Sequence, residues 1–291
     1  PKPQNPSDVM SLIFKIMQSV NYDATYQLGT GHGLIVDLAI SFAFWSTVQA
    51  LFYSWPNLKS YNIPPKTELD LRNRMVSFWH GLAALILSCY QVFFVPYACG
   101  DATSAVSYLI LVNSGGYFMY DVAGMFCFGL LETDMAVHHC LCIGGIIVVL
   151  LSGHDACHVV AGLFVAEVSN PPMHVRVMLR NLGLRYTMAY EVAEYCYFVM
   201  FFFGRVVMGH PVVYDTVTCD SMHLFGKIVS LGVLAQSYLF LYRMFFIMKG
   251  RIAETSERNK KKLRIGWFEP MRVEDLKDCK FYKKKTQDKL P

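Results

Sequence analysis

The stretch "ETDMAVHHCLCIGGIIVVLLSGHDACHVVAGLFVAEVSN" (residues 132–170) decides the fold, because its apolar run is too long for one membrane-spanning helix. A helix needs about 20 apolar residues to cross roughly 30 Å of hydrocarbon. The polar letters SGHD in the middle are typical of a tight turn. Dividing the run there predicts two short spans, Met135–Leu151 and His154–Asn170. Pro171 and Pro172 are expected to end the second span, and the segment after them to lie at the membrane interface.

The rest of the chain has the same membrane character. Of its 291 residues, 54% are hydrophobic and only 16% are charged, against about 25% charged in soluble proteins. We therefore predict an all-α polytopic membrane protein with a bundle of about seven transmembrane helices. The five further spans are Gly33–Trp55, Met75–Val95, Ser104–Leu130, Tyr186–Met208 and Lys227–Met248.

The placement of Lys and Arg favours seven spans, because the loops on the cytoplasmic side carry the excess of these residues. Seven spans place the connections after the first and fifth helices on the same side as the C-terminal tail. Residues 249–291 hold 14 Lys and Arg against 7 Asp and Glu, whereas the residues before them hold 12 against 15. We predict an N-terminal arm (1–32) that begins outside, a transmembrane domain (33–248) and a basic tail (249–291) inside.

Both ends of the chain suggest contacts at the membrane surface. The arm has an amphipathic stretch at Val9–Met17 that suits the bilayer surface or a neighbouring subunit, and no secretory signal peptide is visible. The basic tail suits anionic lipid headgroups or an acidic partner surface, and we expect no nucleic-acid partner. In its "IGWFEPM" sequence, Trp267 and Phe268 offer an anchor amid charges.

Titratable and charged side chains inside the spans are candidates for function, because they are costly in a bilayer. A helix rises 1.5 Å per residue, so the predicted directions give each of them a depth. Those in the inner half are His80, Asp121, His138, His139, Glu167, Glu191, Glu194 and Arg243. Those toward the outer face are Asp37, His154, Asp155, His158 and Arg205. The inner group predicts a polar cavity that opens inward.

The adjacent histidines in this group cannot play the same role, since neighbours on a helix point about 100° apart. A buried neutral imidazole beside a carboxylate acts as a general base or as an acyl-accepting nucleophile. The predicted catalytic residues are His138, His139, Asp121 and Glu167. The predicted cavity-lining residues are His80, Glu191, Glu194 and Arg243. The simpler interpretation is an interhelical hydrogen-bond pair that only holds helices together.

Two histidine pairings have the spacing of metal ligands. His138 with Cys142, and His154 with His158, are separated by four residues, which places two ligands on one helix face. The pairs fall on opposite sides of the membrane, and the nine histidines form no repeated boxes. We therefore expect no metal site.

The nine cysteines lie mostly inside apolar spans, where cysteine behaves as a small buried hydrophobe. Cys99 and Cys219 both fall in outer loops, and their spacing alone leaves pairing open. We expect reduced thiols.

Four segments in this order resemble the TLC domain of translocation-associated membrane proteins, ceramide synthases and TLC-domain-containing proteins. They are "RNRMVSFWHGLAAL" (72–85), "GGYFMYDV" (115–122), "MAVHHC" (135–140) and "LFVAEVSNPPMHVR" (163–176). The resemblance covers roughly residues 33–248 and implies a six-helix core plus one helix around a lipid-accommodating cavity. It matches His138 and His139 to the histidine pair, Asp121 to the acid of the third helix and Glu167 to an acid of the fifth.

The resemblance to ceramide synthases implies N-acyl transfer from acyl-CoA, as co-substrate, to a long-chain amine, with phospholipid bound. The chain departs from those enzymes at Asn170, where they carry a second Asp, and is nearer the TLC-domain-containing branch. We predict lipid binding or such an N-acyltransferase. The alternatives are a non-catalytic accessory subunit of a large membrane assembly, and lipid transport through the same cavity. The resemblance implies the endoplasmic reticulum membrane, with the mitochondrial inner membrane as the alternative.

Overall fold

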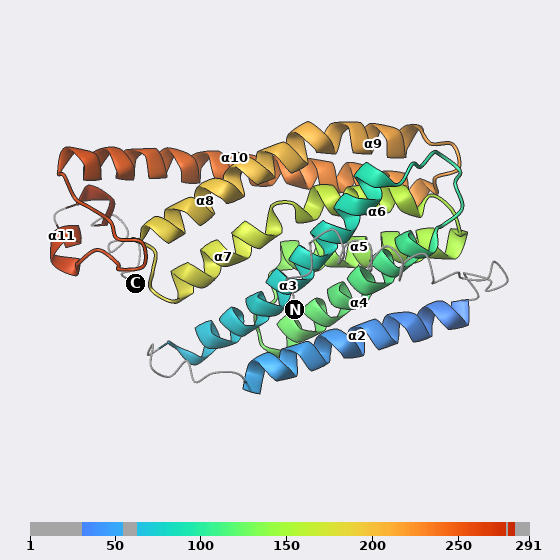
Figure 1. The fold of residues 1–291 in the computed structure, drawn as a ribbon, viewed down its shortest axis with the longest axis horizontal. Helices are drawn as coiled ribbons and strands as arrows, with labels where there is room; N and C mark the ends of the chain where they lie inside the picture. Colours follow the sequence, from blue (N-terminus) through green and yellow to red (C-terminus); the bar gives the residue numbers. More distant parts are fainter. Residues whose placement is uncertain (1–30, 55–62, 278, 283–291) are drawn as a thin grey trace, which may run out of the picture.

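The computed structural model describes residues 31–54, 63–277 and 279–282, which form an all-α polytopic membrane protein (Figure 1). Within these ranges there is no β-strand, and the one β-bridge joins Ala102 to His154. The predicted amphipathic stretch in the arm and the last nine residues of the tail lie outside the described residues. Five segments are helical, long and apolar enough to cross a membrane: Gly33–Ser54, Pro65–Phe94, Thr133–Ser152, Met188–Thr218 and Leu224–Lys260.

The helices follow the order expected from the apolar runs. Their bounds are α2 Gly31–Ser54, α3 Pro65–Phe94, α4 Ala105–Cys127, α5 Thr133–Ser152, α6 Ala156–Glu167, α7 Asn170–Asn181, α8 Met188–Phe201, η2 Phe202–Met208, α9 Gly209–Thr218, α10 Leu224–Lys260 and α11 Val273–Lys277. The structure thus has helix at each of the seven predicted spans. The core lies between α2, α3, α4, α5 and α6, where Val76, Leu111 and Val160 are fully buried.

The fifth predicted span differs most from expectation. Helix α6 has only 12 residues, and after a break at Val168 and Ser169 the chain continues as α7 toward the same end of the bundle (Figure 1). Pro171 and Pro172 stand in the first turn of α7, where a missing N–H leaves no hydrogen bond unmade. The structure therefore differs from the expectation in one respect: the helix already ends at Glu167, and the prolines begin α7 instead of ending α6. Helix α7 packs against α3 and α8, and its position at the membrane interface stays a prediction.

The sixth span is one rod of three parts. Helix α8 passes into the π-helical segment η2 and then into α9. A π-helical turn adds a residue to the helical repeat and so changes which side chains face inward beyond it. Arg205 lies in this segment.

The loops at one end of the bundle are joined by a disulfide between Cys99 and Cys219, whose Cα atoms are 5.3 Å apart and whose positions are 120 residues apart in sequence. The bond connects the α3–α4 loop with the α9–α10 loop. The expectation of reduced thiols was wrong for this pair, because spacing along the chain does not show that two loops meet at one end of a bundle. The other seven cysteines form no disulfide.

The opposite end carries the tail. Helix α10 has 37 residues, or about 55 Å at 1.5 Å per residue, which exceeds the roughly 30 Å of hydrocarbon. The chain then folds back onto the start of α8 (Figure 1). The Met188 N–H donates to the Gly266 carbonyl at 2.9 Å and the Ala189 N–H to the Trp267 carbonyl at 3.2 Å.

Candidate functional site

His139 and Asp121 form the centre of the candidate site. Helix α5 places the His139 ring against α4, where Nδ1 lies 3.2 Å from Asp121 Oδ2. Both side chains are almost fully buried. The direction of the ring N–H does not meet hydrogen-bond geometry, so His139 Nδ1 has no aligned partner among the described residues. The contact is therefore a close approach between a ring and a carboxylate.

Neighbouring side chains hold the Asp121 carboxyl group in place. Asn73 of α3 donates from Nδ2 to Asp121 Oδ1 at 3.0 Å. The Tyr120 hydroxyl lies 2.9 Å from both Asn73 Oδ1 and Gln49 Oε1 of α2. This chain of amides and a phenol joins α2, α3 and α4 beside the pair and restricts the position of the Asp121 carboxyl group, while Gln49 Nε2 is buried without a partner.

His138 points to a different helix. Its Nδ1 lies 2.9 Å from Gln236 Oε1 of α10, and its Nε2 lies 3.8 Å from Cys142 Sγ one turn along α5. Because Oε1 is an acceptor, Nδ1 carries the proton and Nε2 keeps its lone pair. The two histidine rings are 5.6 Å apart between centroids. The pair therefore divides its contacts, with His139 toward Asp121 and His138 toward α10.

Glu167, at the end of α6, belongs to the same region and is 2% exposed. Its Oε2 accepts from Asn170 Nδ2 at 2.8 Å. A Cβ at Gly81 would stand 3.1 Å from this oxygen, so glycine leaves room for the carboxyl group on α3. Asn170, the position at which ceramide synthases were expected to carry an acid, thus serves here as a donor to Glu167.

Arg205 also belongs to this region, although the sequence placed it toward the outer face. Its Nη2 donates to the Ala166 carbonyl at 3.2 Å and its Nη1 to Ser237 Oγ at 3.4 Å, while Nε is buried without a partner. Ala166 precedes Glu167, so the guanidinium lies beside the inner site. The outer assignment was wrong because α6 has only 12 residues, so that its end meets the η2 backbone, where the Cβ position of Gly204 lies 3.0 Å from the Val165 carbonyl.

His80 has an aromatic environment rather than an acidic one. Its ring stacks on Tyr117 with centroids 3.7 Å apart and meets Trp45 edge-on at 5.4 Å. Its Nε2 lies 3.3 Å from Ser114 Oγ. At 1% exposure it is a core side chain that joins α3 to α4.

Glu191 and Glu194 lie apart from the histidines, at the inner end of α8. Glu194 accepts from Arg176 Nε at 2.8 Å and also pairs with Arg251 of α10, while Glu191 pairs with Arg258. The full ion-pair cluster consists of Glu191, Glu194, Glu254, Arg176, Arg185, Arg251 and Arg258. Arg243 is elsewhere again, in an exposed pair with Asp134 at 3.4 Å.

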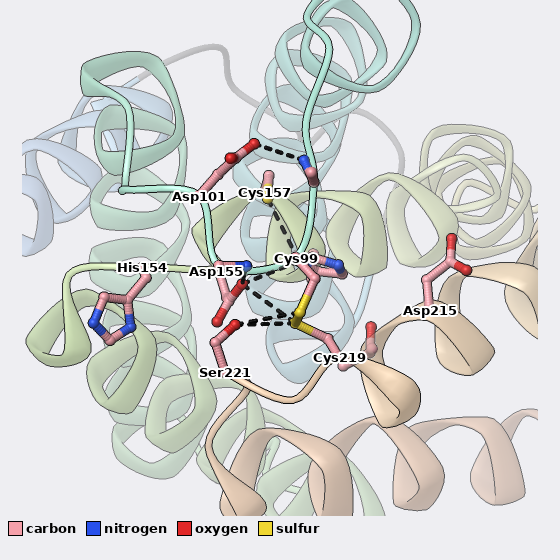
Figure 2. Close-up of polar contacts among 12 residues, drawn as sticks. Cys99, Asp101, His154, Asp155, Cys157, Asp215, Cys219 and Ser221 are labelled. Atoms are coloured by element: carbon pink, nitrogen blue, oxygen red, sulfur yellow. Dashed lines mark hydrogen bonds and ion pairs between the residues drawn. A yellow bond between two sulfur atoms is a disulfide. The ribbon is translucent and has the colours of Figure 1, made fainter.

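Of the outer polar group, Asp155 lies beside the disulfide (Figure 2), whereas Asp37 accepts from the Tyr108 hydroxyl at 2.6 Å. Asp155 is 1% exposed and accepts from the Gly100 N–H at 2.8 Å, and Ser221 lies beside both sulfur atoms. Asp155, Cys99 and Cys219 are the one set of three possible metal ligands in the described part of the chain. Their sulfurs are bonded to each other, so they are not thiolates.

Two further features concern the outer end. His154 lies before the first residue of α6, whereas His158 lies in its first turn. The two residues therefore do not share one helix face, as their spacing had suggested. Burial, with Asp215 nearby, raises the pKa of Tyr97 in the α3–α4 loop above its usual range.

The sequence did not single out Asn73, Tyr120 or Gln236 as site residues, and it placed Arg205 toward the outer face. Gln236 could have been found from the sequence, because it is a polar residue among the apolar residues of α10. Asn73 sits among charged residues near the start of α3, where polarity is ordinary. Two partners of Glu191 and Glu194 were missed because Arg251 and Arg258 lie beyond the predicted end of the last span, and Arg176 was expected at the membrane interface.

The fold and the site define a helical membrane protein with a buried histidine–acid pair between its helices. The family model of the TLC domain matches residues 70–250, more than half of the chain, and the protein belongs to this family. TLC domain-containing protein 1 of Gallus gallus is 26% identical over 150 residues, which are 50% of this chain and 58% of that protein. Its Homo sapiens counterpart is 27% identical over 184 residues, covering 60% and 69%.

The chain thus spans less than two thirds of the chicken relative's length. The predicted resemblance to the TLC domain, nearer the TLC-domain-containing branch, is confirmed.

Proposed function

We propose that this protein modifies lipids as an acyl-CoA-dependent N-acyltransferase in which His139, oriented by Asp121, is the general base. The observation that carries the proposal is the 3.2 Å approach of His139 Nδ1 to Asp121 Oδ2, both buried between helices of a membrane bundle. A carboxylate beside Nδ1 favours the proton on that nitrogen and leaves the lone pair of Nε2 free to accept one. The surrounding bilayer supplies acyl lipids and long-chain amines as the class of reactant.

The proposed reaction is attack of an amine on a thioester. The amine nitrogen forms a bond to the acyl carbonyl carbon while His139 Nε2 takes the proton that the nitrogen loses. The carbon–sulfur bond then breaks, and the thiolate leaving group takes that proton. The products are an amide and free coenzyme A thiol, and His139 returns to its neutral form.

Two neighbouring groups support the same reaction. His138, whose Nε2 has only the weak Cys142 thiol as a partner, is a second proton acceptor beside His139. The buried Arg205 guanidinium keeps one N–H without a partner, and such a donor can stabilise negative charge on the carbonyl oxygen of the tetrahedral intermediate.

Replacement of Asp121 by Asn is the sharpest test, since Asn has nearly the same shape and keeps the contact with Asn73. For purified protein in nanodiscs, with acyl-CoA and a long-chain amine, we expect amide formation to fall about 100-fold or more in Asp121→Asn and His139→Ala, the usual scale for lost general-base catalysis. Arg243→Gln, which breaks an exposed ion pair with Asp134 at the start of α5, is the control and should keep full activity. Normal turnover in folded Asp121→Asn and His139→Ala proteins would eliminate the proposed mechanism.

The organelle is also a proposal. The Cys99–Cys219 disulfide joins loops on the outer side, and disulfides persist in oxidising compartments. This supports the endoplasmic reticulum membrane, with the outer loops in its lumen.

A further inference from the structure

Hydrogen bonds to α8 fix the position of the tail segment around Trp267 and Phe268 along the long axis of the helix bundle. Backbone hydrogen bonds from Met188 and Ala189 to the Gly266 and Trp267 carbonyls tie it to the first turn of α8. A third bond, from the Met271 N–H to the Tyr186 carbonyl at 3.3 Å, holds the other side of the segment. The position of these aromatic residues along the membrane normal therefore follows from that of α8.

The inner limit of the lipid-facing surface can be located on two helices. On α8, the exposed apolar side chains begin at Val192, which is 44% exposed. On α10 they end at Ile252, which is 61% exposed. The buried ion pair of Glu194 with Arg251 lies at the same level. Charged groups gather where hydrocarbon gives way to headgroups, so this layer marks the inner boundary of the hydrocarbon.

The aromatic pair lies just beyond that boundary. Ala189 precedes Glu194 by five residues, or about 7.5 Å along α8. The headgroup layer is roughly 5–8 Å thick on each side, since bilayers measure about 40–45 Å with headgroups and about 30 Å without. Trp267 is bonded to Ala189 through its backbone, so it stands at headgroup level.

The exposure and surroundings of the segment suit that level. Trp267 is 64% exposed and Phe268 is 66% exposed, although burial of such rings in a less polar phase is strongly favourable. The exposed side chains just before them are basic: Lys260, Lys262 and Arg264. Aromatic rings flanked by Lys and Arg are the composition of segments that insert among anionic headgroups.

We propose that Trp267 and Phe268 form an interfacial anchor that inserts into the inner leaflet of the protein's own membrane and so holds the basic tail against the bilayer. The occupant of this surface is lipid rather than another protein subunit. The anchor is independent of any chemistry at His139, so activity of the inner site does not bear on it.

Tryptophan fluorescence in nanodiscs that contain phosphatidylserine tests the anchor. The natural chain has four tryptophans, and the difference between it and Trp267→Phe isolates the emission of Trp267. We expect phospholipids brominated near the headgroup end of the acyl chain to quench this emission at least about twofold more than lipids brominated near the chain end. Trp267→Phe changes one exposed side chain, so the fold is not at risk.

Trp79 is the matched control. It is 51% exposed on α3, 14 residues past the helix start, so it faces the hydrocarbon interior. The emission of Trp79 is the difference in fluorescence between the natural chain and Trp79→Phe. Lipids brominated near the chain end should quench it more than lipids brominated near the headgroup end. If Trp267 emission escapes quenching at both depths while Trp79 behaves as expected, the segment faces water or a protein partner and the lipid anchor is overturned.

Discussion

At the scale of single residues, Glu194 is the side chain on which the inner end of the bundle depends most. It is 3% exposed and pairs with both Arg176 and Arg251, and its Oε1 also accepts from the Tyr190 hydroxyl at 3.1 Å. Arg251 is itself 5% exposed and lies over the Tyr190 ring, 4.9 Å from its centroid. Removing one member of such a buried group leaves an opposite charge unpaired away from water, which costs more than the pair contributes when intact.

Glu194→Gln should therefore destabilise the protein strongly. The substitution keeps the size of the side chain but leaves the half-buried Arg176 without its charged partner and the buried Arg251 with Glu254 alone. We expect a loss of about 3 kcal/mol in unfolding free energy, measured as reversible denaturation in detergent. Arg243→Gln breaks an exposed pair with Asp134 and should cost about 1 kcal/mol or less. Equal effects of the two substitutions would contradict a buried, structural role for Glu194.

The sequence located the centre of the site but not its supporting residues. Matching depths along helices correctly brought His139 and Asp121 together, since both depths follow from the rise per residue. The same depth reasoning grouped Glu191 and Glu194 with them, yet these face a different helix and find arginines in the extension of α10. The depth of a residue shows how far along the membrane normal its side chain lies, but it does not show which neighbouring helix the side chain faces.

At the scale of helices, the contact between α2 and α4 depends on two adjacent glycines. A Cβ at Gly116 would stand 2.3 Å from Ser41 Oγ and 2.8 Å from the Phe42 backbone nitrogen. At Gly115 it would lie 2.9 Å from a methyl group of Leu38. Small residues allow helix backbones to approach closely in membranes, where packing rather than hydrophobicity drives association.

Gly116→Ala should push α2 away from α4, because the Phe42 backbone cannot give way as a side chain can. We expect a loss of about 1–3 kcal/mol in unfolding free energy, the usual cost of overpacking. Gly162→Ala on α6 is the matched control, since nothing lies within 4 Å of its Cβ position, and there alanine should be neutral or stabilise the helix by up to about 1 kcal/mol. Thermal unfolding of both variants in the same detergent gives the comparison, and a Gly116→Ala protein as stable as the natural one would show that α2 is not closely packed.

The order and approximate centres of the helices were predictable because each contains an apolar run. Their polar extensions were missed: α3 begins ten residues before the predicted span, the rod of α8, η2 and α9 ends ten residues after it, and α10 ends twelve residues after it. The breaks inside runs were not predictable. The division between α6 and α7 falls at Val168 and Ser169, where no glycine marks it, and the two prolines after it start a helix as well as they end one. The π-helical segment around Arg205 leaves the hydrophobic pattern almost unchanged, so the sequence carries little signal for it.

At the scale of the whole molecule, the two ends differ in chemistry. One end has the α3–α4 and α9–α10 loops, joined by the Cys99–Cys219 disulfide. The other has the ion-pair cluster and the basic tail folded onto α8. A disulfide belongs in an oxidising compartment and an excess of Lys and Arg on the cytoplasmic side. Two unrelated properties therefore predict the same orientation, with the tail in the cytoplasm.

Single cysteines at the two ends test this orientation. Leu131 lies in the α4–α5 loop and His154 in the α5–α6 loop, and both are exposed. In a background in which the exposed Cys127, Cys140 and Cys196 are serine, a membrane-impermeant maleimide applied from the cytoplasmic side should label Leu131→Cys. It should reach His154→Cys only after the membrane is permeabilised, because the two loops lie at opposite ends of α5, a helix of 20 residues that spans about 30 Å. An inverted molecule would give the opposite pattern, and it would place the disulfide in the reducing cytoplasm, where a bond of this kind does not persist.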